Sequence, residues 1–316
     1  MYKTFFFLSC LVMVALAGCT NTYKNGDPLD TPTAGHITIA SDGSFRPIVE
    51  AEVDVFEGIY KHAKIDTEWL PENEAIQELV KGNVRLAVVS RDLTEAEKNI
   101  IRSQKYTPRP PLRIAVDGVA LIIHKQNPDS MLTMDQVRSI FEGQTKQWSE
   151  LGDGGPQQDI RIVFDSNNSS NLNFILRTFS LEDLKNLNVF AAESNEEVIA
   201  YVEDHENAMG VIGAGWISDL EDPSDQKFLR SISVVALADT TNPTENDYYQ
   251  PYQAYLALKK YPLRRDVLII SREARAGLGS GFMSHVAGDR GQRIILKSGL
   301  LPVTMPVRIV EIRNTL

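Results

Sequence analysis

Cysteine and histidine are scarce in this chain of 316 residues, and their scarcity excludes several kinds of site. The two cysteines, Cys10 and Cys19, both lie in the first 19 residues. The rest of the chain therefore has no thiol for a disulfide bond or a cysteine-ligated metal. The five histidines are scattered and show no His-Glu-x-x-His or other ligand spacing. We expect no metal site and no cofactor.

Catalytic signatures are also missing. Residues 203–206 (EDHE) crowd three carboxylates and one histidine into a single helical turn, but side chains one or two positions apart point in different directions, which indicates a solvated face. Residues 277–282 (GLGSGF) lack both the lysine of a phosphate-binding loop and the Gly-x-Ser-x-Gly elbow, so we expect a flexible loop. The sequence predicts that the protein is not an enzyme.

Positive charge is in deficit, because 32 lysines and arginines face 42 carboxylates and the net charge is −10. This balance excludes a general nucleic-acid surface and an electrostatic membrane surface. It is compatible with one small anion in a cleft, where local backbone donors matter more than the total charge.

The N-terminus has the layout of an export signal. Lys3 precedes an apolar run from Phe5 to Ala17, which is too short to span a membrane comfortably. The tetrapeptide ending at Cys19 (LAGC) resembles a bacterial lipobox, which implies a signal peptide over residues 1–18 and a lipid on the Cys19 sulfur. An uncleaved anchor with an incidental cysteine is the alternative. The polar residues 19–35 then read as a tether.

The body of the chain alternates short β-branched runs with helical patterns, which predicts an α/β fold with parallel strands. We expect two lobes of similar size, linked by crossing segments near 114–123 and 252–258. Lobe 1 would be discontinuous, with residues 36–116 and 254–316, and lobe 2 would hold residues 117–253.

Local signals predict several helix ends. Pro47 is tolerated only in a first turn, which places a helix start near Ser44. Thr133 is a candidate N-cap, and Gly82 a candidate C-cap. We also expect one long helix near the C-terminus that ends at Gly299, followed by a final strand or tail.

Small polar residues separate a strand from a helix at three places, near residues 41–45, 90–92 and 165–170. An unbroken run of six serines and asparagines, residues 166–171, begins in the last of these. A helix start leaves N–H groups unpaired and carries partial positive charge, and the carboxyl edge of a parallel sheet is where α/β proteins bind ligands. Ordinary helix capping accounts for any one turn. The three together favour a cradle of donors for one anion.

Residues 117–152 closely resemble the phosphate-binding proteins of bacterial ABC transporters. The matching positions are Asp117, Gly118, Asn127, Pro128, Ile140, Phe141, Gly143, Trp148, Glu150, Leu151 and Gly152. Weaker matches (VVSRDLTEAE, GVIGAGWI and the HVAGDRGQRIILKSGLLPV helix) extend the resemblance over most of the chain. It implies a type II periplasmic binding-protein fold, with two α/β lobes, a central cleft and two crossover strands.

The resemblance also implies a set of site residues. The phosphate-binding positions would be Gly43, Ser44, Phe45, Ser90, Arg91, Asn168, Ser169 and Ser170. The family commonly carries an arginine just before the last of these turns, and this sequence has none there. Arg91 and Arg46 are candidates to replace its charge, and surface or interlobe ion pairs are the alternative for both. Asp42, Asp92 and Asp165 are candidates to accept a proton from the ligand.

The function implied by the resemblance is capture of inorganic phosphate, or a related oxyanion, for uptake by an ABC permease. The protein would be a monomer without nucleic-acid partners, periplasmic or on the cell surface, and held to the membrane through Cys19. A second hypothesis keeps the fold but not the ligand: an oxyanion-sensing or interaction lipoprotein whose ligand has changed or been lost. A phosphohydrolase that uses the cleft is the third and least favoured hypothesis.

Overall fold

The computed structural model describes residues 30–152, 155–218 and 229–306. The first elements are β1 (Ala34–Ser41), η1 (Gly43–Phe45), α2 (Arg46–Ile59), β2 (His62–Trp69), α3 (Glu72–Lys81), β3 (Leu86–Val89), α4 (Glu95–Ser103) and β4 (Leu112–His124). The middle of the chain adds β5 (Met131–Thr133), α5 (Met134–Phe141), η2 (Trp148–Glu150), β6 (Arg161–Phe164), α6 (Ser170–Phe179), β7 (Val189–Ala191), α7 (Asn195–Asp204), β8 (Ala208–Gly213), η3 (Ala214–Trp216), β9 (Ile232–Val234), β10 (Ala236–Ala238), η4 (Glu245–Asp247) and α9 (Gln253–Ala257). The last described elements are β11 (Arg264–Ser271), α10 (Leu278–Ala287), α11 (Asp289–Lys297) and β12 (Leu301–Pro302).

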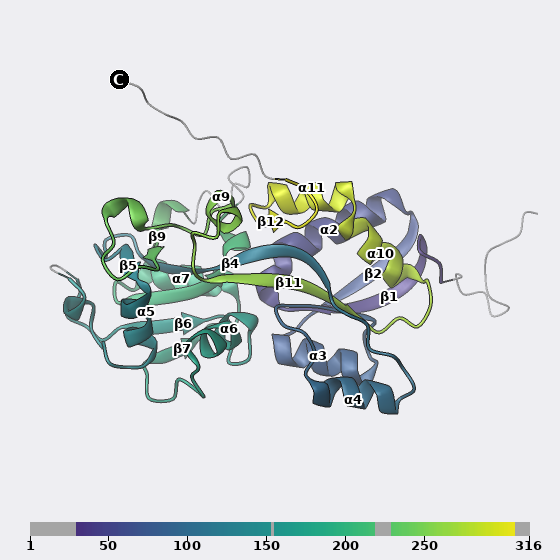
Figure 1. Ribbon diagram of the computed structural model, residues 1–316, viewed down its shortest axis with the longest axis horizontal. Coiled ribbons are helices and arrows are strands. Elements are labelled where there is room, and N and C mark those ends of the chain that lie inside the picture. Colours follow the sequence, from purple (N-terminus) through teal and green to yellow (C-terminus); the bar gives the residue numbers. More distant parts are fainter. Residues whose placement is uncertain (1–29, 153–154, 219–228, 307–316) are drawn as a thin grey trace, which may run out of the picture.

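Most of the strands join one long sheet, in the order β2-β1-β3-β11-β4-β8-β6-β7. β1 runs parallel to β2 and β3, and β6 runs parallel to β7 and β8, whereas β11 runs antiparallel to β3 and β4. Figure 1 shows two α/β lobes joined by β4 and β11. We call the part with β1–β3, α2–α4, α10 and α11 lobe 1, and the part with β5–β10, α5–α7 and α9 lobe 2. The predicted α/β fold of two lobes with two crossover strands is confirmed.

β4 ties the hydrophobic cores of the two lobes together. Near its start, Ile114 and Ala115 pack in the core of lobe 1. Farther along, Val119 and Leu121 pack on one face of lobe 2 and Ala120 packs on the other. Successive side chains of a strand point to opposite faces, so a strand covered on both faces carries an unbroken apolar run. This is why residues 114–123 are apolar apart from Asp117 and Gly118.

The predicted helix caps are present. Thr133 caps α5: its hydroxyl accepts from the Gln136 N–H at 3.1 Å, and the Gln136 side-chain oxygen accepts from the Thr133 N–H at 2.8 Å. Gly82 ends α3 with a φ of 90°, which favours glycine. α2 begins at Arg46, one residue before Pro47, and η1 occupies the stretch where the helix start was predicted.

The predicted second crossing, at residues 252–258, is wrong. That segment forms the short helix α9, and β11 makes the crossing instead. The run from Val267 to Ile270 is buried because β11 lies between β3 and β4 and is paired on both edges. A short apolar run does not distinguish a strand from a buried helical turn, and the pairing partners decide between them.

The expected loop at residues 277–282 and the single long C-terminal helix are also wrong. The glycine-rich stretch is the start of α10, and α10 and α11 are separate helices that meet at Gly288. The carboxylate of Glu273 accepts from the N–H groups of Gly279 and Ser280, at 3.0 and 2.6 Å, and so caps α10. The glycines allow close approach, since a Cβ on Gly281 would lie 1.8 Å from the Pro32 carbonyl oxygen.

Several predictions fall outside the described residues. These are the signal peptide, Cys19 and the final strand or tail after Pro306. The end of the expected tether belongs to the folded body, because Ala34 and Gly35 already lie in β1. In the described part of the chain, no helix combines the length and the apolar character that crossing a membrane requires.

We predict that Gly281→Ala destabilises the protein, because its methyl group would overlap the backbone of Pro32. Overpacking of this kind costs about 1–3 kcal/mol. Gly58→Ala is the matched control: it lies in α2, its Cβ would contact nothing within 4 Å, and alanine stabilises a helix relative to glycine by roughly 0.5–1 kcal/mol. Urea unfolding of both variants tests this. Equal stability of the two variants would contradict the close approach.

Candidate anion-binding site

The turns after β1 and β6 meet where the two lobes join. Ser44 lies in η1, directly after β1, and Ser170 is the first residue of α6, which follows β6. Both side chains are buried, and their hydroxyl oxygens lie 3.1 Å apart. The predicted cradle required these two turns to face each other across the lobes, and they do.

The carboxylate of Asp42 lies at the centre of this junction and is fully buried. Its Oδ1 accepts from the Ser44 N–H at 3.0 Å and from the Ser170 hydroxyl at 2.7 Å. Its Oδ2 accepts from the Ser170 N–H at 2.9 Å. A carboxylate from lobe 1 therefore occupies the N-terminus of α6 in lobe 2, where unpaired N–H groups and the helix dipole favour a negative charge.

Arg265 brings a positive charge to the same junction. Its Nε donates to Asp117 Oδ2 at 2.9 Å, and Nη2 forms an ion pair with the same oxygen at 2.8 Å. Nη1 donates to the Ser170 hydroxyl oxygen at 3.0 Å, and the guanidinium lies 4.8 Å from the centre of the Phe45 ring. Asp117 and Arg265 come from β4 and β11, so the two crossover strands supply the ion pair beneath the junction.

The environment of Asp117 shows why it needs this partner. Its Oδ1 also accepts from the N–H groups of Gly118 and Ala214, at 2.8 and 3.2 Å. Burial raises the pKa of Asp117, and the positive charge of Arg265 opposes that effect. A buried carboxylate and guanidinium are stable together only with such geometry, and either group alone would be very costly.

A third carboxylate, Asp165, is buried close by. Its oxygens accept from the side-chain amides of Asn171 and Asn195, at 3.2 and 3.3 Å. Burial, together with the negative charge of Asp42, raises the pKa of Asp165 to about 7. Asp42 and Asp165 are therefore buried near each other, and a proton on Asp165 offsets part of their mutual repulsion.

The remaining predicted residues of lobe 2 and of the first turn have distinct places. Ser169 is the N-cap of α6 and accepts from the Leu172 N–H at 3.3 Å. Asn168 is exposed, and its carbonyl accepts from the Asn173 side chain. Phe45 is buried beneath Arg265, and Gly43 lines a cavity next to the junction.

Ser90 and Arg91 do not reach the Ser44–Ser170 junction. The N–H and hydroxyl of Ser90 both donate to Glu72 Oε1, at 2.8 and 2.5 Å. Arg91 pairs with Glu97 at 2.9 Å, and Arg46 pairs with Glu50 at 2.7 Å. Local carboxylates hold both arginines, and the guanidinium that contacts the junction is that of Arg265.

Glu72 also links the lobes. It is the first residue of α3 and is fully buried. Its Oε2 accepts from Arg177 at 3.3 Å and from the Asn173 side chain at 3.4 Å, and both of these residues lie in α6. α6 therefore receives one carboxylate of lobe 1 at its N-terminus and another two turns along its side.

A cavity of about 140 Å³ lies next to Asp42 and Asp165. It is lined from both lobes, and its walls include Gly43, Arg46, Trp69, Asn195 and Trp216. Within the described residues, no group of three or more His, Cys, Asp or Glu side chains could hold a metal ion.

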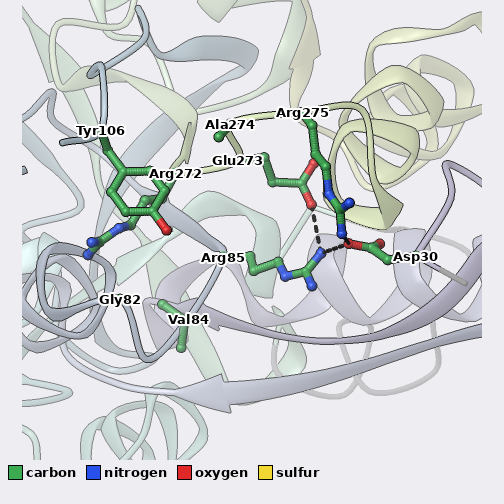
Figure 2. Close-up of a pocket in the computed structure, with 9 residues that line it drawn as sticks. All are labelled: Asp30, Gly82, Val84, Arg85, Tyr106, Arg272, Glu273, Ala274 and Arg275. Carbon is green, nitrogen blue, oxygen red and sulfur yellow. Dashed lines mark hydrogen bonds and ion pairs between the residues drawn. The ribbon is translucent and has the colours of Figure 1, made fainter. Parts of the chain in front are cut away.

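A second cavity, of about 310 Å³, lies in lobe 1 at the amino ends of the strands (Figure 2). Arg85 donates there to both Asp30 and Glu273, as the dashed lines show, and Arg272 lies over the Tyr106 ring with 4.6 Å to its centre. Asp30 also accepts from the Leu278 N–H at 2.9 Å. These charges hold the start of β1 against α10.

The comparison with known families decides the classification. A profile of the PBP superfamily domain matches residues 27–290. The chain belongs to the PBP superfamily. The two lobes with crossing strands are a type II periplasmic binding-protein fold.

Curated relatives and solved structures are consistent with this family. The phosphate-binding protein PstS of Pseudomonas aeruginosa is 22% identical over 293 residues, which cover 88% of this chain and 85% of that protein. PstS of Bacillus subtilis is 21% identical over 304 residues, covering 94% and 92%. A phosphate ABC transporter substrate-binding protein from Clostridium perfringens, solved with bound phosphate, has a TM-score of 0.71 at 24% identity, covering 85% of this chain and 100% of that one.

A phosphate transport receptor from Vibrio cholerae shares the fold as well. Its TM-score is 0.62 at 22% identity, and the match covers 85% of this chain and 100% of that one. The relatives found are named as binding proteins, in agreement with the expectation that the chain is not an enzyme.

Sequence reasoning missed Arg265, Asn171 and Asn195, and it did not assign a role to Asp117. One signal for the Asp117–Arg265 pair was present. Asp117 interrupts a long apolar run, and a charge inside a buried strand requires a partner of opposite sign. The sequence contains many arginines that fit this requirement, and only the pairing of β4 with β11 selects Arg265.

Breaking the buried ion pair should be costly. We predict that Arg265→Met lowers the free energy of unfolding by about 3–5 kcal/mol, because it leaves the Asp117 carboxylate buried without a cation. The double variant Arg265→Met, Asp117→Asn should recover a large part of the loss, since the amide oxygen can still accept from Gly118 and Ala214. Urea unfolding of the single and double variants measures both effects. Strictly additive losses would contradict the coupling.

The raised pKa of Asp165 predicts a dependence of stability on pH. In the folded protein this carboxyl holds its proton up to about pH 7, whereas in the unfolded chain it loses it near its ordinary value of 3.8. The folded state binds more protons between these values, so the free energy of unfolding should fall as pH rises from about 4 to 7. Asp165→Asn should flatten that decline, and Asp54→Asn, at an exposed position, should leave it unchanged. The urea midpoints of unfolding of the three proteins, measured from about pH 4 to 7, test this prediction.

Proposed function

We propose that this protein captures inorganic phosphate between its two lobes and delivers it to an ABC transporter. The observation that carries this proposal is the buried junction between the lobes. Hydroxyl and amide donors of Ser44 and Ser170 converge there, at the N-terminus of α6 and next to Arg265. Each of these groups favours a negative charge.

The donor set suits a compact oxyanion. The Ser44 and Ser170 hydroxyls and the Ser170 N–H point into the same buried space, and the Arg265 guanidinium reaches the Ser170 hydroxyl at 3.0 Å. Micromolar affinity needs about 8 kcal/mol. A few charge-assisted hydrogen bonds of roughly 1.5–3 kcal/mol each reach that value after the costs of ordering.

The comparisons support phosphate as the anion. The PstS relatives are named as phosphate-binding proteins, and the Clostridium perfringens protein was solved with phosphate bound. The division of the lobes at residues 116–117 and 253–254 belongs to this proposal, as do the eight predicted phosphate-binding positions, of which Ser90 and Arg91 lie in a separate turn and contact Glu72 and Glu97. Asp42 and Asp165 remain candidates to accept a proton from the ligand.

The proposed setting is outside the cytoplasm. A receptor that serves an ABC permease must meet its ligand before transport, and the N-terminal signal and the lipobox-like residues before Cys19 are consistent with an exported, lipid-anchored monomer. Treating whole cells with a lipoprotein signal peptidase inhibitor tests the anchor, since the uncleaved precursor should accumulate.

A second candidate function is an oxyanion-sensing or interaction lipoprotein that has changed or lost its ligand. The observation that favours it is the carboxylate of Asp42, which lies among the donors that phosphate would use. In that case inorganic phosphate would not bind, or binding would not depend on Ser170.

The proposal predicts that inorganic phosphate raises the melting temperature of phosphate-stripped protein and that sulfate does so weakly. Ser170→Ala should weaken phosphate binding by about tenfold or more, because a hydrogen bond to a charged ligand contributes roughly 1.5–3 kcal/mol. Ser149→Ala, at an exposed position of lobe 2, is the control and should bind like the original protein. Calorimetry measures both variants. Absence of heat and of any thermal shift with millimolar phosphate would refute the proposal.

A further inference from the structure

The donors proposed for the anion already have a partner within the chain. The Ser170 hydroxyl has one proton, and it is donated to Asp42 Oδ1 at 2.7 Å. The Ser170 N–H is donated to Oδ2 at 2.9 Å, and the Ser44 N–H to Oδ1 at 3.0 Å. None of these three protons can be donated to a bound anion at the same time. A ligand and the Asp42 carboxylate therefore compete for the same place.

We propose that Asp42 is an internal competitor for the anion, which holds the lobes together in the absence of ligand and must turn away when phosphate binds. This inference rests on the proposed function, since it concerns the same donors. It makes Asp42 the residue that sets the affinity of the cleft and the closed state of the free protein.

Asp42 is the N-cap of η1, but toward α6 its geometry is that of a bound ligand rather than of a helix cap. An ordinary cap comes from the residue that precedes the helix, and Ser169 already fills that place for α6. Asp42 comes from the other lobe, 128 positions away in the sequence from Ser170. Its two oxygens bridge a turn of lobe 1 and a helix start of lobe 2, as a captured anion would.

The start of α10 shows what a permanent internal carboxylate looks like in this protein. Glu273 and Asp30 accept from its first N–H groups, and Arg85 pairs with both of them (Figure 2). Asp42, by contrast, forms no ion pair with any residue in the described part of the chain. The cation nearest to the junction, Arg265, has Asp117 as its partner.

There is room for the displaced side chain. The cavity of about 140 Å³ is lined by Asp42 itself and by Arg46 and Asn195. A rotation of the carboxylate into this cavity would bring it toward groups that can donate hydrogen bonds. The three protons that Asp42 accepts from Ser44 and Ser170 would then be free for a bound anion.

Glu72 extends the same arrangement to the other predicted donor turn. Its Oε1 takes both the N–H and the hydroxyl of Ser90, and its Oε2 reaches Arg177 across the lobes. Carboxylates of lobe 1 therefore occupy the donors of both turns and contact α6 at two places. The closed arrangement of the free protein needs no external anion.

The test compares Asp42→Asn and Asp42→Ala with the original protein, by calorimetric titration with inorganic phosphate. Asparagine keeps the volume of the side chain, but its N–H₂ group replaces one of the two oxygens that accept from Ser44 and Ser170. Alanine removes both oxygens. Both variants should bind phosphate at least about tenfold more tightly. Asp54→Asn removes one exposed charge of lobe 1 and should bind like the original protein. Circular dichroism verifies that each variant is folded.

Small-angle scattering without phosphate adds a second readout. The original protein should have the same radius of gyration with and without phosphate, whereas Asp42→Ala should be larger without phosphate and contract when it is added. An Asp42 variant that binds phosphate no better than the original protein, or that keeps its compact size without phosphate, overturns the inference. If no variant binds millimolar phosphate at all, the proposed function itself is refuted.

Discussion

The contact between the Asp42 carboxylate and the first turn of α6 is the interaction on which the cleft depends. It joins the lobes through two hydrogen bonds from Ser170 in a buried space, and a third, from the Ser44 N–H, holds the same carboxylate within lobe 1. A buried carboxylate persists only where donors replace the water that it has lost, and a helix N-terminus offers such donors together with a favourable dipole. An anion that enters this cleft meets Ser44 and Ser170 donors that are already oriented and already hydrogen-bonded to Asp42.

The crossover strands provide the second constraint. β4 carries Asp117 and β11 carries Arg265, and their antiparallel pairing places the two side chains in one buried ion pair. Each strand also packs in the hydrophobic cores, so the guanidinium near Ser170 is held by the rigid centre of the molecule rather than by a loop. The guanidinium of the site therefore comes from a strand that crosses between the lobes.

Three buried carboxylates lie at or next to this cleft. Asp42, Asp117 and Asp165 are all buried, and of these three Asp117 pairs with Arg265, while burial together with the negative charge of Asp42 raises the pKa of Asp165. A site that receives an anion under these conditions must neutralise or displace one of its own carboxylates. The fold is therefore shared with phosphate receptors, and the charge within the cleft is set by the buried carboxylates and Arg265.

The sequence alone determined the α/β class, the two lobes, the strand-to-helix turns and the capped helices, because these depend on apolar periodicity and on residues close together in the chain. Ser44 and Ser170 could be named for the same reason. Only the tertiary structure decided that β11 is the second crossover strand, that Arg265 supplies the cation, and that the Asp42 carboxylate accepts hydrogen bonds from Ser170. Those contacts join residues about 95 to 150 positions apart, as in the pairs Arg265–Ser170, Asp42–Ser170 and Arg265–Asp117. Local patterns carry no information about which of many like side chains the pairing of distant strands will bring together.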